Sequence, residues 1–271
     1  MDGLLLAEQT IWEGLAAYGA ADGTQLLEIE GTRAVITGSS YEAFNAVFSV
    51  EPAPLAAIDR LVGLCRDAGA PVLWHVWPRA GVQVERSLLE RGLVFYEEEP
   101  AMLADLTLGT GPAGPPPELA VSRVETAAEL EAWVRLLSGS DDIGFIRDVV
   151  RLRAASGYGE RAAFEHLLGR VDGEAVAVAA VFHGRRAGEV QHVVTARSHR
   201  RRGLGAAITR AAMALLRRRG HSRAVLTASP DGFGVYSRLG FEPIGNVRRF
   251  VLHAAPTRVR LDTEPPRLDS S

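Results

Sequence analysis

The stretch His199–Ala207, HRRRGLGAA, decides the fold. Three consecutive arginines run into two glycines one residue apart, and apolar residues at helical spacing follow. The preceding segment, 188–195 (GEVQHVVT), has the character of a strand. A basic glycine loop between a strand and a helix N-terminus is typical of an anion site. Backbone N–H groups converge there, and arginine side chains add charge-assisted hydrogen bonds to phosphate oxygens.

The sequence excludes two nucleotide-binding motifs. The Rossmann fingerprint fails because GLGAAI lacks the third glycine. The P-loop requires a lysine, and all 30 basic residues of this chain are arginine. Two alternatives stay open: a solvated arginine run, and a nucleic-acid groove, for which the interleaved aromatic residues that stack bases are absent.

The loop resembles the signature of the GCN5-related N-acetyltransferase (GNAT) superfamily. The run Arg200–Gly205 fits the family pattern Q/R-x-x-G-x-G/A, and the family's Y-x-x-x-G-F follows as Tyr236 to Phe241. The resemblance covers the second half of the chain. It implies the acyl-CoA N-acyltransferase fold, an α/β arrangement with a mixed sheet.

The resemblance also implies a reaction, the acetyl-CoA-dependent N-acetylation of an amine by direct attack in a ternary complex. Acetyl-CoA is expected as co-substrate, without a metal. The loop would bind its pyrophosphate, and amides of the strand 188–195 would bind the pantetheine and polarise the acetyl carbonyl. The residues implied to bind the cofactor are Val193, Val194, Thr195, Arg200, Arg201, Arg202, Gly203, Leu204, Gly205, Ala206, Ser229 and Tyr236.

Three residues are candidates for proton transfer. Tyr236 matches the family tyrosine that protonates the leaving thiolate. Glu189 or His192 could deprotonate the acceptor ammonium, directly or through water, although some family members use no protein base. Ser229 falls where many members carry an asparagine that hydrogen-bonds pantetheine, so this sequence departs from the family pattern at that contact.

The chain divides near residue 110. Residues 109–117, GTGPAGPPP, have the composition of a linker. Residues 1–110 hold 16 acidic and 6 basic residues, a net charge of −10, whereas residues 111–271 hold 17 and 24, a net charge of +7. We therefore expect a first domain over 1–108, a catalytic domain over 118–254 and a tail over 255–271.

The first domain resembles a degenerate GNAT domain. Its order of helix, strand, helix and two strands repeats the end of the second half, but VEPAPL stands where the second half has RRRGLG. It is not expected to bind coenzyme A. We expect it to form one wall of the acceptor cleft, with some of Glu97, Glu98 and Glu99 facing that cleft, or merely to neutralise its basic neighbour.

Bulk composition bounds the remaining expectations. The sequence has no run of about 18 apolar residues, so we expect no membrane span. The N-terminus lacks the pattern of a signal peptide. The single Cys65 has no partner for an internal disulfide, which fits a reducing cytoplasm. The expected partner is a small-molecule amine or a peptide acceptor. The sequence is compatible with an oligomer as well as with a monomer. The sequence does not identify the acceptor or the acyl chain length, and a non-catalytic acyl-CoA sensor remains the main rival function.

Overall fold

The computed structural model describes residues 2–108, 118–160 and 162–253. The predicted linker 109–117 and the predicted tail 255–271 lie outside these described residues.

The first half begins with helices and then builds a small set of strands. Its elements are α1 (Gly3–Ala16), η1 (Ala17–Ala20), β1 (Gln25–Ile29), β2 (Thr32–Ile36), η2 (Glu42–Phe44), β3 (Asn45–Ser49), α2 (Leu55–Asp67), β4 (Val72–Val76), η3 (Pro78–Ala80), α3 (Val82–Glu90) and β5 (Val94–Asp105).

The second half confirms the predicted strand 188–195 and the helix that starts at Leu204. Its elements are β6 (Ala120–Arg123), α4 (Ala127–Ser138), α5 (Ile143–Ala155), β7 (Phe164–Val171), β8 (Glu174–His183), β9 (Gly188–Thr195), η4 (Arg197–His199), α6 (Leu204–Arg218), β10 (Arg223–Thr227), α7 (Pro230–Arg238) and β11 (Glu242–Leu252).

One mixed sheet of 11 strands runs through both halves, in the order β1-β2-β3-β4-β11-β5-β10-β9-β8-β7-β6. The central pair is antiparallel β11 and β5. The strands on the two sides of this pair follow the same pattern. β4 pairs antiparallel with β11, as β10 does with β5, and β3 then pairs parallel with β4, as β9 does with β10. The strands farther out on each side pair antiparallel. The arrangement is therefore an internal duplication in which β3 corresponds to β9 and β4 to β10.

The last strand of each half is exchanged. β11 lies between β4 and β5, and β5 lies between β11 and β10, so each half completes the sheet of the other. The prediction of two short final strands in each half is wrong, since β5 and β11 are continuous. β5 pairs with β11 over Val94–Leu103 and with β10 over Ala101–Asp105, so its hydrogen-bonding partners follow one another without a break. The irregularity after Pro243 of β11 is absorbed as a bulge before Gly245.

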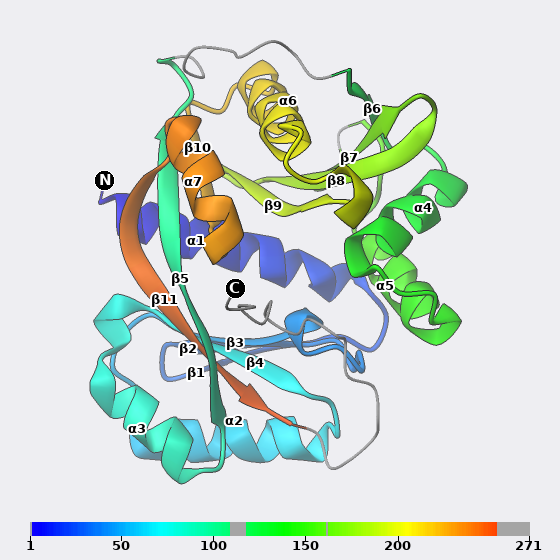
Figure 1. Ribbon diagram of the computed structural model, residues 1–271. Coiled ribbons are helices and arrows are strands. Elements are labelled where there is room, and N and C mark those ends of the chain that lie inside the picture. The colour runs from blue at the N-terminus through cyan, green and yellow to red at the C-terminus, as the bar shows by residue number, and fades with distance from the viewer. Residues whose placement is uncertain (1, 109–117, 161, 254–271) are drawn as a thin grey trace, which may run out of the picture.

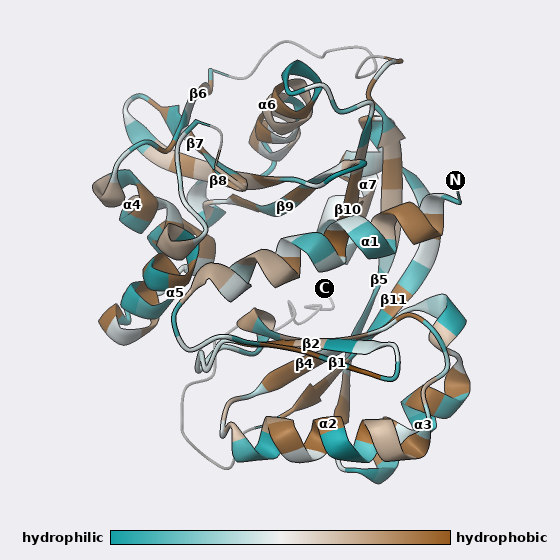
Figure 2. Ribbon diagram, turned by 180° about the vertical axis from the view of Figure 1, so that it is seen from behind, coloured by the Kyte–Doolittle hydropathy of each residue, from teal (hydrophilic) through white to brown (hydrophobic). Residues whose placement is uncertain are grey.

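Helices cover both faces of this sheet. α2 and α3 pack on the outer face of the first half, and α6 and α7 pack on the outer face of the second. The inner faces of the two halves approach each other, and α1 lies between them in both views (Figures 1 and 2). α4 and α5 complete the inner side of the second half and share a core with η1 and η2. Within the described residues, no helix has the length and apolarity needed to cross a membrane.

The strand exchange predicts that the halves fold only together. A fragment lacking residues 1–108 would leave both edges of β11 and one edge of β10 without partners. Each half expressed alone should fail to unfold cooperatively by circular dichroism. Two fragments cut between Leu108 and Glu118 and co-expressed should instead co-purify and unfold in one transition. A second half that folds cooperatively by itself would contradict the exchange.

Candidate active site

The site begins where β9 and β10 diverge. These parallel strands pair only at Gly188 with Ala224 and at Glu189 with Val225. From Val190 onward β9 has no strand partner on the β10 side among the described residues. The divergence leaves one edge of β9 available to hydrogen-bond a ligand in place of a strand.

A β-bulge lies in the part of β9 that has no partner on the β10 side among the described residues. The register between β8 and β9 shifts between Val178 and Ala180, and His192 has a φ of 55°. A left-handed φ is uncommon for a residue other than glycine and changes the direction of the following amides. Val193, Val194 and Thr195, the predicted cofactor contacts, follow this bulge and are half-buried, so their backbone is partly accessible.

The basic loop connects β9 to α6. Arg201 and Gly203 both have left-handed backbone, with φ of 63° and 77°, and α6 starts at the next residue. No side chain of the residues that the structure describes caps α6, and no acidic residue lies in its first turn. The N–H groups of Leu204, Gly205 and Ala206 stand at the helix positions that have no carbonyl partner within the helix, and a bound anion can satisfy them.

The three predicted arginines are exposed around this helix end. The Arg200 Nε donates to the Thr195 carbonyl at 3.3 Å, which ties the loop to the end of β9. In the part of the chain that the structure describes, Arg200, Arg201 and Arg202 form no ion pair. Cations at a helix N-terminus are unfavourable for that helix, and an anion would reverse the sign of this interaction.

Ser229 immediately precedes α7, and Tyr236 lies within it. Ser229 is the N-cap, and its Oγ accepts a hydrogen bond from the Gly232 N–H at 3.3 Å. The Tyr236 ring packs directly over Gly232, where a Cβ would lie only 2.6 Å from Tyr236 Cε2. Burial and the nearby Glu99 raise the pKa of Tyr236 to about 12, so its hydroxyl keeps its proton at neutral pH. Gly232 thus makes room for a protonated tyrosine.

Glu189 lies on the inner face of the sheet, beneath α1. Its side chain is 8% exposed, and its Oε2 lies so close to Gly14 that a Cβ there would be 2.8 Å away. The Gln191 side-chain amide donates to the same oxygen at 3.3 Å. Burial raises the pKa of the Glu189 carboxyl to about 8, against the opposing influence of Arg153 and Arg249. With this pKa the carboxyl is mostly protonated at pH 7, and its carboxylate form is a stronger base than that of an ordinary glutamate.

His192 differs from Glu189 in its surroundings. Its ring lies 6.0 Å from the Trp133 ring and points toward the interior. Burial, Arg153 and His166 hold the pKa of His192 well below its usual value, so the imidazole is neutral and weakly basic. Of the two predicted bases, Glu189 has the more suitable pKa.

The acidic segment of β5 faces two ways. Arg249 of β11 donates from Nη1 to Glu97 Oε1 and Glu99 Oε2, both at 2.7 Å. Glu98 lies on the opposite face and pairs with Arg248 at 3.3 Å. Two of the three glutamates therefore share the inner face with Glu189. Sequence reasoning missed Arg249, because its contacts depend on the exchange of β5 and β11.

The corresponding strands of the first half, β3 and β4, do not diverge in the same way. β3 and β4 pair over four positions, from Ala46 with Leu73 to Ser49 with Val76. The backbone N–H of Trp77 donates to the Ser49 carbonyl at 2.9 Å, and the indole N–H of Trp74 donates to the Ser49 hydroxyl at 2.9 Å. No gap comparable to the one between β9 and β10 is present in these described strands.

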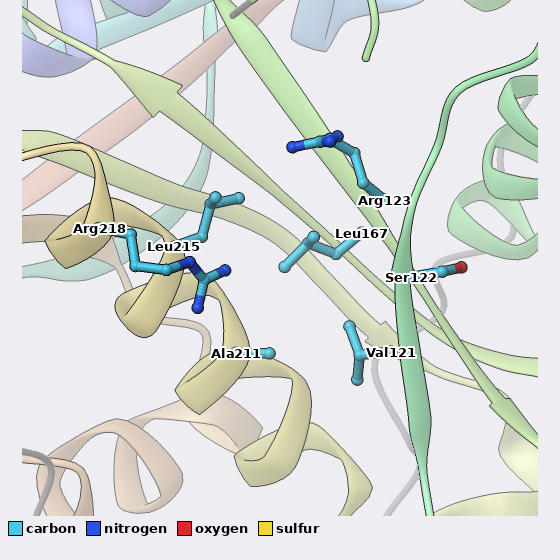
Figure 3. A pocket seen from close by; sticks show the side chains of 7 residues that line it. All are labelled: Val121, Ser122, Arg123, Leu167, Ala211, Leu215 and Arg218. Atoms are coloured by element: carbon cyan, nitrogen blue, oxygen red, sulfur yellow. The ribbon is translucent and has the colours of Figure 1, made fainter. Parts of the chain in front are cut away.

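Two pockets lie outside the opening between β9 and β10. One, of about 260 Å³, lies between β6, β7 and α6. Figure 3 shows its apolar side chains flanked by two arginines. The residues that line it are Val121, Ser122, Arg123, Leu167, Ala211, Leu215 and Arg218. The other, of about 280 Å³, lies between α1, the β1–β2 turn and the end of β3. None of the predicted site residues lines either pocket. Across the described residues, no group of three or more His, Cys, Asp or Glu side chains could hold a metal ion.

Comparisons with known proteins bear on the fold. Residues 167–251 match the family model described as FR47-like protein. A GCN5-related N-acetyltransferase from Kribbella flavida is 21% identical over 93% of this chain and 96% of its own, with a TM-score of 0.68. A tandem GNAT protein from the clavulanic acid biosynthesis pathway is 14% identical over 94% of this chain and 95% of its own, with a TM-score of 0.59. Among curated protein sequences, none matches this chain.

The two likenesses extend over nearly the whole chain, so both halves of the sheet are shared with these structures. The expected mixed α/β class and tandem arrangement are confirmed. The chain has the acyl-CoA N-acyltransferase fold of the GNAT superfamily.

Proposed function

We propose that this protein is an acetyl-CoA-dependent N-acetyltransferase whose active site lies in the second half. The observation that carries the proposal is the divergence of β9 from β10 immediately before a helix that starts with an uncapped, arginine-rich turn. An extended ligand with an anionic end fits both features at once. A basic surface for nucleic acid would not require the strands to separate.

The residues present fit acetyl-CoA. The amides at the start of α6 and the three arginines would hold the pyrophosphate, and the free edge of β9 after His192 would hold the pantetheine. When bound, acetyl-CoA supplies the thioester that donates the acetyl group. The amides around Val193 and Val194 would polarise its carbonyl.

Two side chains would move protons around that carbonyl. Glu189 would take a proton from the acceptor ammonium, which its pKa of about 8 favours. Tyr236 would give its proton to the departing sulfur, which its high pKa permits. The two approach from opposite faces of the sheet, since Tyr236 comes from α7 and Glu189 lies beneath α1.

The first half would serve the acceptor rather than the cofactor. The closed pairing of β3 with β4 supports the absence of a second acyl-CoA site. The inner position of Glu97 and Glu99 supports an acidic wall that attracts a cationic amine, a small molecule or a peptide end.

A Tyr236→Phe variant tests the leaving-group role. We expect kcat to fall by roughly 10- to 10³-fold, because the thiolate would leave without a proton donor. The Kd for acetyl-CoA, measured by calorimetry, should change little. Tyr158→Phe, in the connection between α5 and β7, serves as the matched control. An unchanged kcat for Tyr236→Phe would return that tyrosine to a structural role.

The acyl-CoA sensor is the rival function on the same fold. It predicts calorimetric binding of acetyl-CoA with no amine-dependent release of thiol. Binding and turnover measured on one preparation separate the two functions.

A further inference from the structure

The most unusual buried group in the described structure is Arg153, in α5. Its side chain is fully buried, and none of its three guanidinium nitrogens has a hydrogen-bond partner among the described residues. Buried charges are normally paired, because an uncompensated charge in the interior is costly. Unpaired buried polar groups in native proteins are few and call for an explanation.

Aromatic rings from both halves enclose this guanidinium. Its carbon lies 5.2 Å from the Tyr18 ring and 5.7 Å from the Phe44 ring, both in the first half. It lies 5.5 Å from the Trp133 ring and 5.1 Å from the Phe164 ring, both in the second half. Cation–π contacts stabilise the charge but leave every N–H free to bind an oxygen.

Two imidazoles add further polar nitrogens to this region. His166 is fully buried and lies 4.7 Å from the Trp133 ring, and within the described part of the chain neither of its ring nitrogens has a hydrogen-bond partner. The His192 ring also lies beside Trp133, at 6.0 Å between ring centroids. Burial and Arg153 keep the pKa of both imidazoles well below the usual value, so each is neutral. The region thus holds the Arg153 cation and, beside it, imidazole nitrogens of His166 that form no hydrogen bond within the described residues.

Arg153 also lies near the proposed active site. Its guanidinium carbon lies 5.5 Å from the Trp133 ring, which the His192 ring also contacts at 6.0 Å. Its charge also influences the pKa of His192, in the bulge of β9, and of Glu189, three residues before it. Glu189 forms no ion pair with it among the described residues, since its Oε2 instead lies beside Gly14 and Gln191. The guanidinium therefore remains free for a group brought in by a substrate.

We propose that the acceptor is an amine that also carries a carboxylate, and that Arg153 binds this carboxylate between the two halves. The proposal rests on the proposed function and names the substrate class of that site. One guanidinium matches a monoanion, and its planar fork suits a carboxylate in two parallel hydrogen bonds. The amino group would then lie toward Glu189 and the acetyl carbonyl.

Entry to Arg153 requires side chains to move. The bulge residue His192 is half-buried and lies between the β9 opening and Trp133. Rotation of its ring, together with a shift of the aromatic enclosure, would admit the carboxylate. Selectivity for a carboxylate, rather than stability alone, is therefore the diagnostic property of Arg153.

The turnover arm of the test uses matched amines. Thiol release from acetyl-CoA is measured for phenylalanine against phenethylamine and for 4-aminobutyrate against propylamine. At least one carboxylate-bearing member should have a kcat/KM about 10- to 100-fold above its partner, the range for a hydrogen bond to a charged group. Arg153→Met should remove this preference, Arg153→Lys should restore part of it, and Arg147→Met, exposed on the same helix, should leave it intact.

The binding arm does not depend on turnover. Benzoate and 4-phenylbutyrate, with benzyl alcohol as the neutral comparison, are added to the full chain with acetyl-CoA, and Tm is measured. A carboxylate should raise the Tm of the wild type and of Arg147→Met but not of Arg153→Met. This pattern without amine turnover supports the carboxylate site and refutes the proposed function. Equal responses of wild type and Arg153→Met to every carboxylate, with no preference in turnover, would overturn the inference and leave Arg153 a packing residue.

Discussion

Glutamate in place of Gly203 should raise the Kd for acetyl-CoA by at least about 100-fold, because it removes more than one charge-assisted contact to the pyrophosphate. Gly203 has a φ of 77°, and it is the last residue before α6. A side chain there would strain the left-handed backbone and place a carboxylate at the unpartnered amides of Leu204 and Gly205. Calorimetric titration of acetyl-CoA measures the effect.

The matched control is Gly220→Glu, beyond the other end of α6. Gly220 has a φ of 89° and open space around its Cα, so the backbone strain is similar but the added charge lies away from the loop. This variant should bind acetyl-CoA like the wild type. Equal losses of affinity in the two variants would indicate damage to α6, and unchanged affinity in Gly203→Glu would remove the loop from the cofactor site.

Glu189→Gln should have the second large effect, lowering kcat by about 10²- to 10⁴-fold. Glutamine keeps the size of the side chain and its contact with Gly14, but it cannot accept a proton. Because burial raises the pKa of Glu189 to about 8, the deprotonated base gains population as the pH rises. The wild-type kcat should therefore increase from pH 6, reach half its maximum near pH 8 and level off above about pH 9, and the variant should lose this dependence.

His192→Ala is the comparison for that experiment. The pKa of His192 is well below its usual value, so its titration cannot produce a limb near pH 8. This variant should retain the rise of kcat with pH even where its rate is altered. Loss of the pH dependence in His192→Ala, with its retention in Glu189→Gln, would transfer the role of base to His192.

The local parts of the candidate site could be predicted from sequence. The loop, the strand before it and the helix after it are adjacent in the chain, so their residue pattern carries the information directly. Leu204 begins α6, and strand 188–195 has the bounds expected. Tyr236 could be placed by its spacing from Gly240 and Phe241, which the resemblance supplied.

The long-range parts could not be predicted. The contact of Arg249 with Glu97 and Glu99 joins residues some 150 positions apart and exists only because β5 and β11 change places. Each long strand has the same local pattern as two short strands, and it is continuous because one partner strand takes over where the other ends. The aromatic enclosure of Arg153 likewise combines Tyr18 and Phe44 with rings from the other half.

The central claim is acetyl transfer to an amine, and one measurement tests it most directly. The full-length protein is incubated with acetyl-CoA and a panel of primary amines, with and without a carboxylate, and both free thiol and acetylated amine are quantified. The account predicts thiol release that depends on the amine, with an equal amount of N-acetylated product, and its loss in Gly203→Glu. Calorimetric binding of acetyl-CoA without amine-dependent thiol release for any amine would contradict it.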